Sequence, residues 1–137
     1  MKTPIFDSCK LHINGINYVC PVEVPELLAK GAQLVDIRED FEIFLKTFLV
    51  ENIIYLPFKN LKADHTSLSI DVPLIIADSV GLWSKEAVLF LQSKGYENIA
   101  SLAGGIIDWE RDGLPLKNDK GQQLNGPCLC MLKTQKR

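Results

Sequence analysis

The sequence predicts a parallel α/β sheet with helices on both faces, because two patterns alternate along the chain. Short apolar runs at residues 33–37, 52–56, 74–77 and 98–102 have the length and branching of buried strands. Apolar residues at helical spacing lie between these runs. Strands that alternate with helices favour a parallel sheet with right-handed crossovers.

The clearest unit is a strand, a six-residue loop and a helix at residues 73–94. The apolar run 74–77 is followed by the loop that begins at Asp78, and we expect Ser84 to be the N-cap of the helix and Gly95 its C-cap. In a parallel sheet this loop lies at the carboxyl end of a strand, where ligands bind. Its amides point toward a helix N-terminus that favours anions. We therefore expect the functional site at this loop.

An Asn-Gly pair at residues 14–15 between alternating apolar segments predicts an N-terminal β-hairpin. A two-residue loop pairs Ile13 with Ile16, and the same register places Cys9 opposite Cys20. Cross-strand neighbours have Cβ atoms about 4.5–5.5 Å apart, so the two thiols could reach one metal ion or, with slight adjustment, each other.

The remaining elements follow in chain order. We expect a helix at residues 23–30, a strand at 33–37, a helix at 40–46, a strand at 52–56, a weak helix or loop at 61–68, a strand at 98–102 and a last helix at 105–111. From residue 117 the chain is polar, and a turn at 125–127 leads to a Cys-Leu-Cys segment and a basic end.

Length and composition indicate one ordinary domain. The chain has 137 residues, of which 47% are apolar, and its formal net charge is −2. This balance predicts no nucleic-acid surface, and the apolar stretches are too short for a membrane span. The N-terminus lacks the pattern of a signal peptide, so we expect a cytoplasmic protein without a nucleic-acid or membrane partner.

The strand, loop and helix at residues 73–94 resemble the active-site segment of rhodanese-like sulfurtransferase domains. Further resemblances are Val-Asp-Ile-Arg-Glu at 35–39, Gly-Tyr at 95–96, Leu-Ala-Gly-Gly-Ile at 102–106 with Trp109, and Gly-Leu-Pro at 113–115. The resemblance covers about residues 22–116. It implies a single rhodanese-like domain at 22–117 with about five parallel strands and helices on both faces. The hairpin extension would occupy 1–21 and a cysteine-containing tail 118–137.

The chain departs from this family at the position that matters for chemistry. In the family the first loop residue is the Cys that forms a persulfide, and basic residues commonly follow it. Here the first residue is Asp78, and the loop contains neither Arg nor Lys; it consists of Asp78, Ser79, Val80, Gly81, Leu82 and Trp83. The family's Gly-His-Ile-Pro-Gly-Ala stretch is also missing, and residues 46–54 read Lys-Thr-Phe-Leu-Val-Glu-Asn-Ile-Ile. A carboxylate cannot form a persulfide, so we expect no sulfur transfer from this loop.

Two interpretations of the loop residues remain open. Asp78 is either a built-in anion for the loop amides, which a helix N-terminus stabilises by about 0.3–1 kcal/mol, or a plain capping residue. Leu82 and Trp83 form either a contact surface for a protein partner or, if Trp83 folds back, a cover over the domain. A small anion is the other ligand that this loop could bind.

Asp36 and Arg38 are predicted to be structural. Asp36 ends a buried strand, where a lone carboxylate is costly unless it is paired. Arg38 supplies five donors two residues further on, so we expect the two side chains to pair.

The four cysteines leave further alternatives open. Cys9, Cys20, Cys128 and Cys130 could form a zinc site if the chain termini lie close together. Alternatively, Cys128 and Cys130 act as redox or sulfur-carrying groups near the Asp78 loop, or all four are incidental thiols.

Three classes of function follow from these observations. The first is a non-catalytic rhodanese-like module, without a cofactor, that binds a partner or regulates one. The second is a sulfurtransferase that uses Cys128 or Cys130 in place of the missing loop cysteine. The third is a metal-binding or redox-sensing protein that acts through its terminal cysteines.

Overall fold

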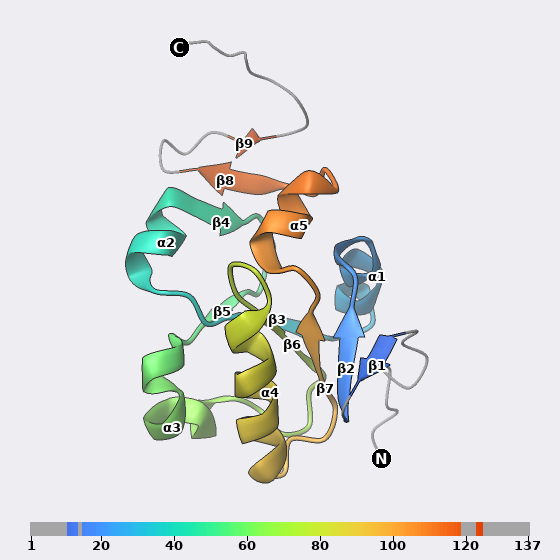
Figure 1. Cartoon of the computed structure of the whole chain (residues 1–137), viewed down its shortest axis with the longest axis vertical. Coiled ribbons are helices and arrows are strands. Elements are labelled where there is room, and N and C mark those ends of the chain that lie inside the picture. Colours follow the sequence, from blue (N-terminus) through green and yellow to red (C-terminus); the bar gives the residue numbers. More distant parts are fainter. Residues whose placement is uncertain (1–10, 14, 119–122, 125–137) are drawn as a thin grey trace.

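The computed structural model describes residues 11–13, 15–118 and 123–124. A six-stranded sheet forms its centre, with the strand order β1-β2-β7-β6-β3-β5 (Figure 1). The five strands from β2 to β5 in this order are parallel, and β1 is antiparallel to β2. The predicted fold class is therefore confirmed, with β6 in the interior of the sheet.

The predicted N-terminal hairpin is present in the predicted register. Strand β1 (Leu11–Ile13) pairs with β2 (Ile16–Val19), and Ile13 lies opposite Ile16. Cys9 lies outside the described residues, so its pairing with Cys20 stays a prediction. The sequence did not indicate that β2 would also pair in parallel with β7 (Ile99–Leu102), which makes the hairpin one edge of the main sheet.

The other elements fall close to the predicted segments. The remaining strands of the main sheet are β3 (Gln33–Asp36), β5 (Ile54–Tyr55) and β6 (Leu74–Ala77). The α-helices are α1 (Val24–Ala29), α2 (Asp40–Leu45), α3 (Leu61–Asp64), α4 (Leu82–Ser93) and α5 (Gly105–Arg111). Short 3-10 turns, η1 (Pro21–Glu23), η2 (Phe58–Asn60) and η3 (His65–Ser67), flank α1 and α3.

The predicted start of the central helix is wrong. Helix α4 begins at Leu82 rather than after Ser84, and its N-cap is Gly81, whose φ of 93° is left-handed. Ser84 is buried within the first turn, where its hydroxyl contacts the hydroxyl of Ser101 at 2.7 Å. An Asp earlier in the loop supplies the capping carboxylate, so no cap is needed at Ser84.

A second, three-stranded sheet was not predicted. Strand β4 (Lys46–Phe48) follows α2 directly and pairs antiparallel with β8 (Leu116–Asn118), which pairs antiparallel with β9 (Gln123–Leu124). Its strands are too short to show a period of two, and β4 lies far from β8 in the sequence.

Two apolar clusters cover the two faces of the main sheet. Helices α1 and α5 pack on one face and α3 and α4 on the other (Figure 1). Alternation along β6 sends Ile75 and Ala77 into the first cluster and Leu74 and Ile76 into the second. Burial on both faces explains why β6 is a continuous apolar run. The loop that follows it therefore starts from a rigid position.

Candidate functional site

The Asp78 carboxylate occupies the centre of the loop between β6 and α4. Its Oδ1 accepts the N–H of Gly81 at 2.6 Å, and its Oδ2 accepts the N–H groups of Trp83 at 2.7 Å and Ser84 at 3.2 Å. The residue is 2% exposed. The loop thus closes around its own anion, at the helix N-terminus where a negative charge is favoured.

The first residues of α5 hydrogen-bond to the backbone of this loop. Ile106 donates its N–H to the carbonyl of Asp78 at 2.9 Å, and Ile107 donates to the carbonyl of Ser79 at 3.2 Å. Gly105 has a φ of 60°, and a Cβ there would lie 2.5 Å from the carbonyl oxygen of Asp78. Only a glycine lets the two backbones approach this closely.

Asp36 and Arg38 form a buried ion pair below the site. Arg38 Nη2 lies 2.8 Å from Asp36 Oδ2, and Arg38 Nε donates to Asp36 Oδ1 at 3.0 Å. Arg38 Nη2 also donates to the carbonyl of Lys46, and its guanidinium lies over the Phe48 ring. Because these partners engage the guanidinium inside the protein, Arg38 does not act as a free cation for a ligand.

Tyr55 lies opposite Asp36 across the β3–β5 pair. Burial raises the pKa of the Tyr55 hydroxyl, and the charge of Asp36 raises it further, while Arg38 acts in the opposite direction. The phenol therefore stays a neutral hydroxyl beside the ion pair.

A cavity of about 330 Å³ lies in front of the Asp78 loop. Helix α2 forms one wall through Glu42, whose Oε2 accepts the hydroxyl of Ser79 at 2.8 Å. Besides Arg38 and Asp78, the other charged residues of the lining are Glu39, at the N-cap of α2, and Lys59 of η2, which pair at 3.3 Å. Carboxylates rather than free cations therefore dominate the charge that this cavity presents.

The tip of the loop is apolar and exposed. Val80, Leu82 and Trp83 are 50%, 60% and 56% exposed. The Trp83 ring leans on Phe58 with 5.1 Å between centroids and an angle of 48° between planes. Trp83 is thus partly folded back, as one sequence interpretation expected, and still offers half of its surface, as the other expected.

The predicted cysteine sites fall mainly outside the described part of the chain. Cys20 is exposed at the end of β2, and Cys9, Cys128 and Cys130 are not described. Within residues 11–13, 15–118 and 123–124, no three His, Cys, Asp or Glu side chains gather as metal ligands. The zinc and tail-cysteine hypotheses stay predictions.

Sequence reasoning missed three residues that shape the site: Glu42, Phe58 and Gly105. Glu42 had a usable signal, because a carboxylate three residues after the N-cap is part of a capping box, and its Oε1 does accept the N–H of Glu39. Its contact with Ser79 had no such signal. That contact depends on how α2 is placed against the loop.

Comparison with known proteins identifies the family to which this fold and loop belong. Residues 21–112 match the rhodanese-like domain family. The thiosulfate sulfurtransferase GlpE of Haemophilus influenzae (strain PittEE) is 33% identical over 102 residues, which span 72% of this chain and 91% of that protein. This chain belongs to the rhodanese-like family.

Other rhodanese-like relatives support the assignment. A sulfurtransferase of Allochromatium vinosum is 32% identical over 88 residues, covering 64% of this chain and 80% of that protein. The crystal structure of a rhodanese-related protein from Thermoplasma volcanium superposes with a TM-score of 0.66 at 28% identity, over 72% of this chain and 95% of the other. The rhodanese-like fold and the relation to sulfurtransferases are thereby established.

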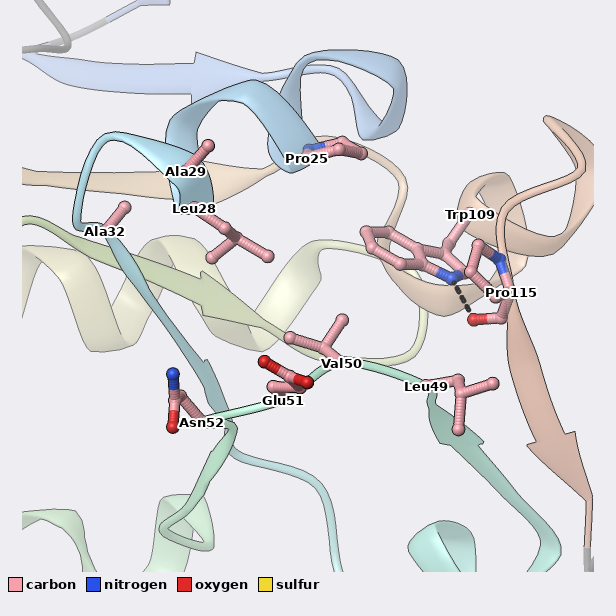
Figure 2. Close-up of a pocket in the computed structure, with 10 residues that line it drawn as sticks. All are labelled: Pro25, Leu28, Ala29, Ala32, Leu49, Val50, Glu51, Asn52, Trp109 and Pro115. Atoms are coloured by element: carbon pink, nitrogen blue, oxygen red, sulfur yellow. Dashed lines mark hydrogen bonds between the residues drawn. The ribbon is translucent and has the colours of Figure 1, made fainter.

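This rhodanese-like domain also has a second cavity, of about 380 Å³, between α1, residues 49–52 and α5 (Figure 2). Figure 2 shows apolar side chains around it, among them Leu28, Val50 and Trp109, whose Nε1 donates to the carbonyl of Pro115 at 2.9 Å. Glu51 is the one charged residue of its lining. The two cavities share no lining residue, and the described residues that line this one include no Cys, Ser, Thr, His or Lys.

None of the helices in the described part of the chain combines the length and the apolar character that a membrane crossing requires.

Proposed function

We propose that this protein is a non-catalytic rhodanese-like module that binds a protein partner at the Asp78 loop. The observation that carries the proposal is the Asp78 carboxylate, which accepts three N–H groups of its own loop. Sulfur transfer requires a thiolate that attacks a sulfane sulfur and holds it as a persulfide. The loop offers a carboxylate in that place, and an oxygen anion there cannot hold the transferred sulfur.

Binding of an anionic donor is disfavoured for the same reason. The Haemophilus influenzae relative is a thiosulfate sulfurtransferase, and thiosulfate is an anion. In this chain the loop amides that would attract an anion already serve Asp78, and Arg38 is engaged by Asp36. Glu42 adds a further carboxylate at the cavity wall. A protein partner therefore suits the loop better than a small anion does.

The exposed tip of the loop supports a protein partner. Val80, Leu82 and Trp83 expose apolar surface around the cavity mouth. Aromatic side chains of this kind are enriched among the residues that contribute most to protein–protein binding. The proposal accordingly assigns the contact surface to this tip and the cavity beside it.

Turnover measurements test the proposal directly. We expect the wild-type protein to show no sulfur transfer with thiosulfate or with a persulfide donor. Asp78→Cys should gain weak activity, because its thiol stands at a helix N-terminus that lowers a thiol pKa, while Ser79 and Trp83 still stand where basic residues are common in the family. Asp78→Ser is the matched control, since it has the size of the Cys variant without the thiol.

A different result would overturn the proposal. If wild-type turnover is substantial and is abolished by Cys128→Ala or Cys130→Ala, the protein is a sulfurtransferase or sulfur carrier that acts through its tail. The same activity in the Asp78→Ser variant would likewise assign the chemistry away from the loop.

A further inference from the structure

The cavity at the Asp78 loop is one end of a longer groove. Two further hollows, of about 370 and 450 Å³, lie between η2, α3 and the first turns of α4. Phe58 lines all three hollows, Trp83 lines the first and second, and Glu86 lines the second and third. We name these three adjoining hollows together the Phe58 groove. Its extent suits a peptide segment better than a small molecule.

The end of the Phe58 groove at Asp78 has an excess of negative charge. Among its described lining residues, Arg38 is paired with Asp36 and Lys59 with Glu39. The carboxylates of Glu42 and Asp78 have no cation among these residues to balance them. Three amides satisfy Asp78, whereas Glu42 receives one bond on each oxygen. A carboxylate has about four acceptor positions, so Glu42 retains capacity for a donor.

The charge excess does not extend along the whole groove. Beyond the aromatic pair, the charged residues that line the other two hollows are Lys59, Lys62, Lys85 and Glu86, three cations and one carboxylate. A bound segment would therefore meet an excess of negative charge at the Asp78 end only. This difference in charge between the two ends would favour one orientation of a bound peptide.

An aromatic wall stands between these two ends. Phe58 is partly buried, and Trp83 stacks against it at 5.1 Å while remaining 56% exposed. An indole face attracts an ammonium or a guanidinium group, most strongly where water is partly excluded. The aliphatic stem of Lys or Arg also packs well on apolar surface while its charged head reaches a carboxylate.

We propose that the Phe58 groove binds a peptide segment of a partner protein that inserts a Lys or Arg side chain between Trp83 and Glu42. Apolar residues of the peptide, next to its Lys or Arg, pack on Val80 and Leu82. The proposal rests on the proposed function and adds the chemistry of the partner. It assigns to this loop a preference for a cation, although the loop lies at a helix N-terminus.

A peptide selection tests the preference without assuming a partner sequence. The probe is a phage-displayed library of random twelve-residue peptides, selected on the immobilised full-length protein. We expect recovered peptides to be enriched in Lys or Arg next to apolar residues, relative to the unselected library. Replacing that Lys or Arg by a neutral residue in a synthetic copy of a recovered peptide should raise its Kd about tenfold, since the change removes a charge-assisted contact.

Variants of the protein then locate the contact. Glu42→Gln keeps hydrogen-bonding groups toward Ser79 and Glu39 but removes the charge, and it should weaken the peptide about tenfold. Trp83→Ala should weaken it as well. Glu97→Gln is the matched control, because Glu97 is exposed and precedes the amino end of β7, whereas the Asp78 loop follows the carboxyl end of the parallel strand β6. Melting temperatures of all variants show whether a loss of binding reflects a loss of folding.

Several outcomes would overturn the inference. These are recovery of no peptides, recovery of acidic peptides, or equal weakening by Glu42→Gln and Glu97→Gln. A full-length chain with Lys133→Glu, Lys136→Glu and Arg137→Glu that binds peptide tenfold more tightly would identify the chain's own basic end as the occupant instead. Thiosulfate turnover is measured separately, so failure of the cation preference is distinguishable from failure of the non-catalytic assignment.

Discussion

At the scale of single residues, the side chain of Asp78 accepts the N–H groups of Gly81, Trp83 and Ser84. A free helix N-terminus with converging amides is an anion site. A carboxylate held within the same loop competes with any external anion as an intramolecular group, without the entropy cost of bringing a free anion to the site. The residue thus combines the two interpretations that the sequence left open, since a capping Asp and a built-in anion are the same contact.

Asp78→Ala should vacate this site. We expect a loss of about 1–3 kcal/mol in the free energy of unfolding, because buried donors lose their acceptor. Sulfate should then raise the melting temperature of Asp78→Ala by more than that of the wild type, since an anion that binds only the folded variant stabilises it. Thermal scans in sodium sulfate and in sodium chloride of equal ionic strength check this, and equal sulfate shifts for the two proteins would contradict it.

Asp36 supports the site through Arg38. In this ion pair the Arg38 side chain is 3% exposed and the Asp36 side chain is fully buried. Removal of the carboxylate therefore leaves a buried cation without its partner. Asp36→Ala should therefore lower the free energy of unfolding by about 3–5 kcal/mol. Denaturant titration measures the loss.

A matched control isolates the effect of burial for this prediction. Asp71 is exposed, and Asp71→Ala should change the stability by less than about 0.5 kcal/mol. An unfolding midpoint of Asp36→Ala equal to that of Asp71→Ala would argue against a structural role for Asp36.

At the scale of elements, the loop depends on two helix starts that meet. The carbonyls of Asp78 and Ser79 accept the first amides of α5, while the Asp78 side chain accepts the first amides of α4. One four-residue strand, β6, and two helices therefore share a single loop. The position of α5 sets the position of the Asp78 carboxylate.

Gly105→Ala should disturb this contact. The added Cβ would meet backbone atoms of Asp78 and Ser79, which cannot move aside as a side chain can. Gly113→Ala is the matched control, because Gly113 also has a positive φ, 81°, but has open space around its Cβ position. We expect the control to lose about 1–2 kcal/mol from the left-handed conformation alone.

Gly105→Ala should lose about 1–3 kcal/mol more than this control, because of the clash. Chemical denaturation of both variants measures the difference. Losses of equal size would show that close approach at Gly105 is unimportant.

At the scale of the whole molecule, the four cysteines lie toward the two ends of the sequence. If Cys9, Cys20, Cys128 and Cys130 form a structural zinc site, metal analysis of the purified protein should find about one zinc per chain, and a chelator should lower the melting temperature. Cys20→Ser should then lower both the zinc content and the melting temperature. A metal-free protein that melts at the same temperature with and without chelator would exclude this site.

The sequence by itself determined the elements whose signals are local. Short apolar runs and helical spacing predicted the main strands and helices, and the Asn-Gly pair predicted that Ile13 lies opposite Ile16. The apolar run of β6 predicted burial on both faces, and therefore a loop at the carboxyl end of an interior strand. The spacing of Asp36 and Arg38 predicted side chains on one face of an extended chain, and the structure places them in contact.

Only the tertiary structure decided the features that join distant segments. The Glu42–Ser79 contact spans 37 positions in the sequence, and the pairs between β4 and β8, from Phe48–Leu116 to Lys46–Asn118, span 68 to 72. The helix starting at Leu82, rather than after Ser84, follows from a carboxylate four residues earlier that folds back on the amides. Hydrophobic periodicity and capping motifs predict the secondary structure of a segment, but they do not include the particular neighbours that the segment meets in the fold. The Phe58 groove depends instead on which side chains α2, η2, α3 and the start of α4 bring together, and that is set when the layers pack.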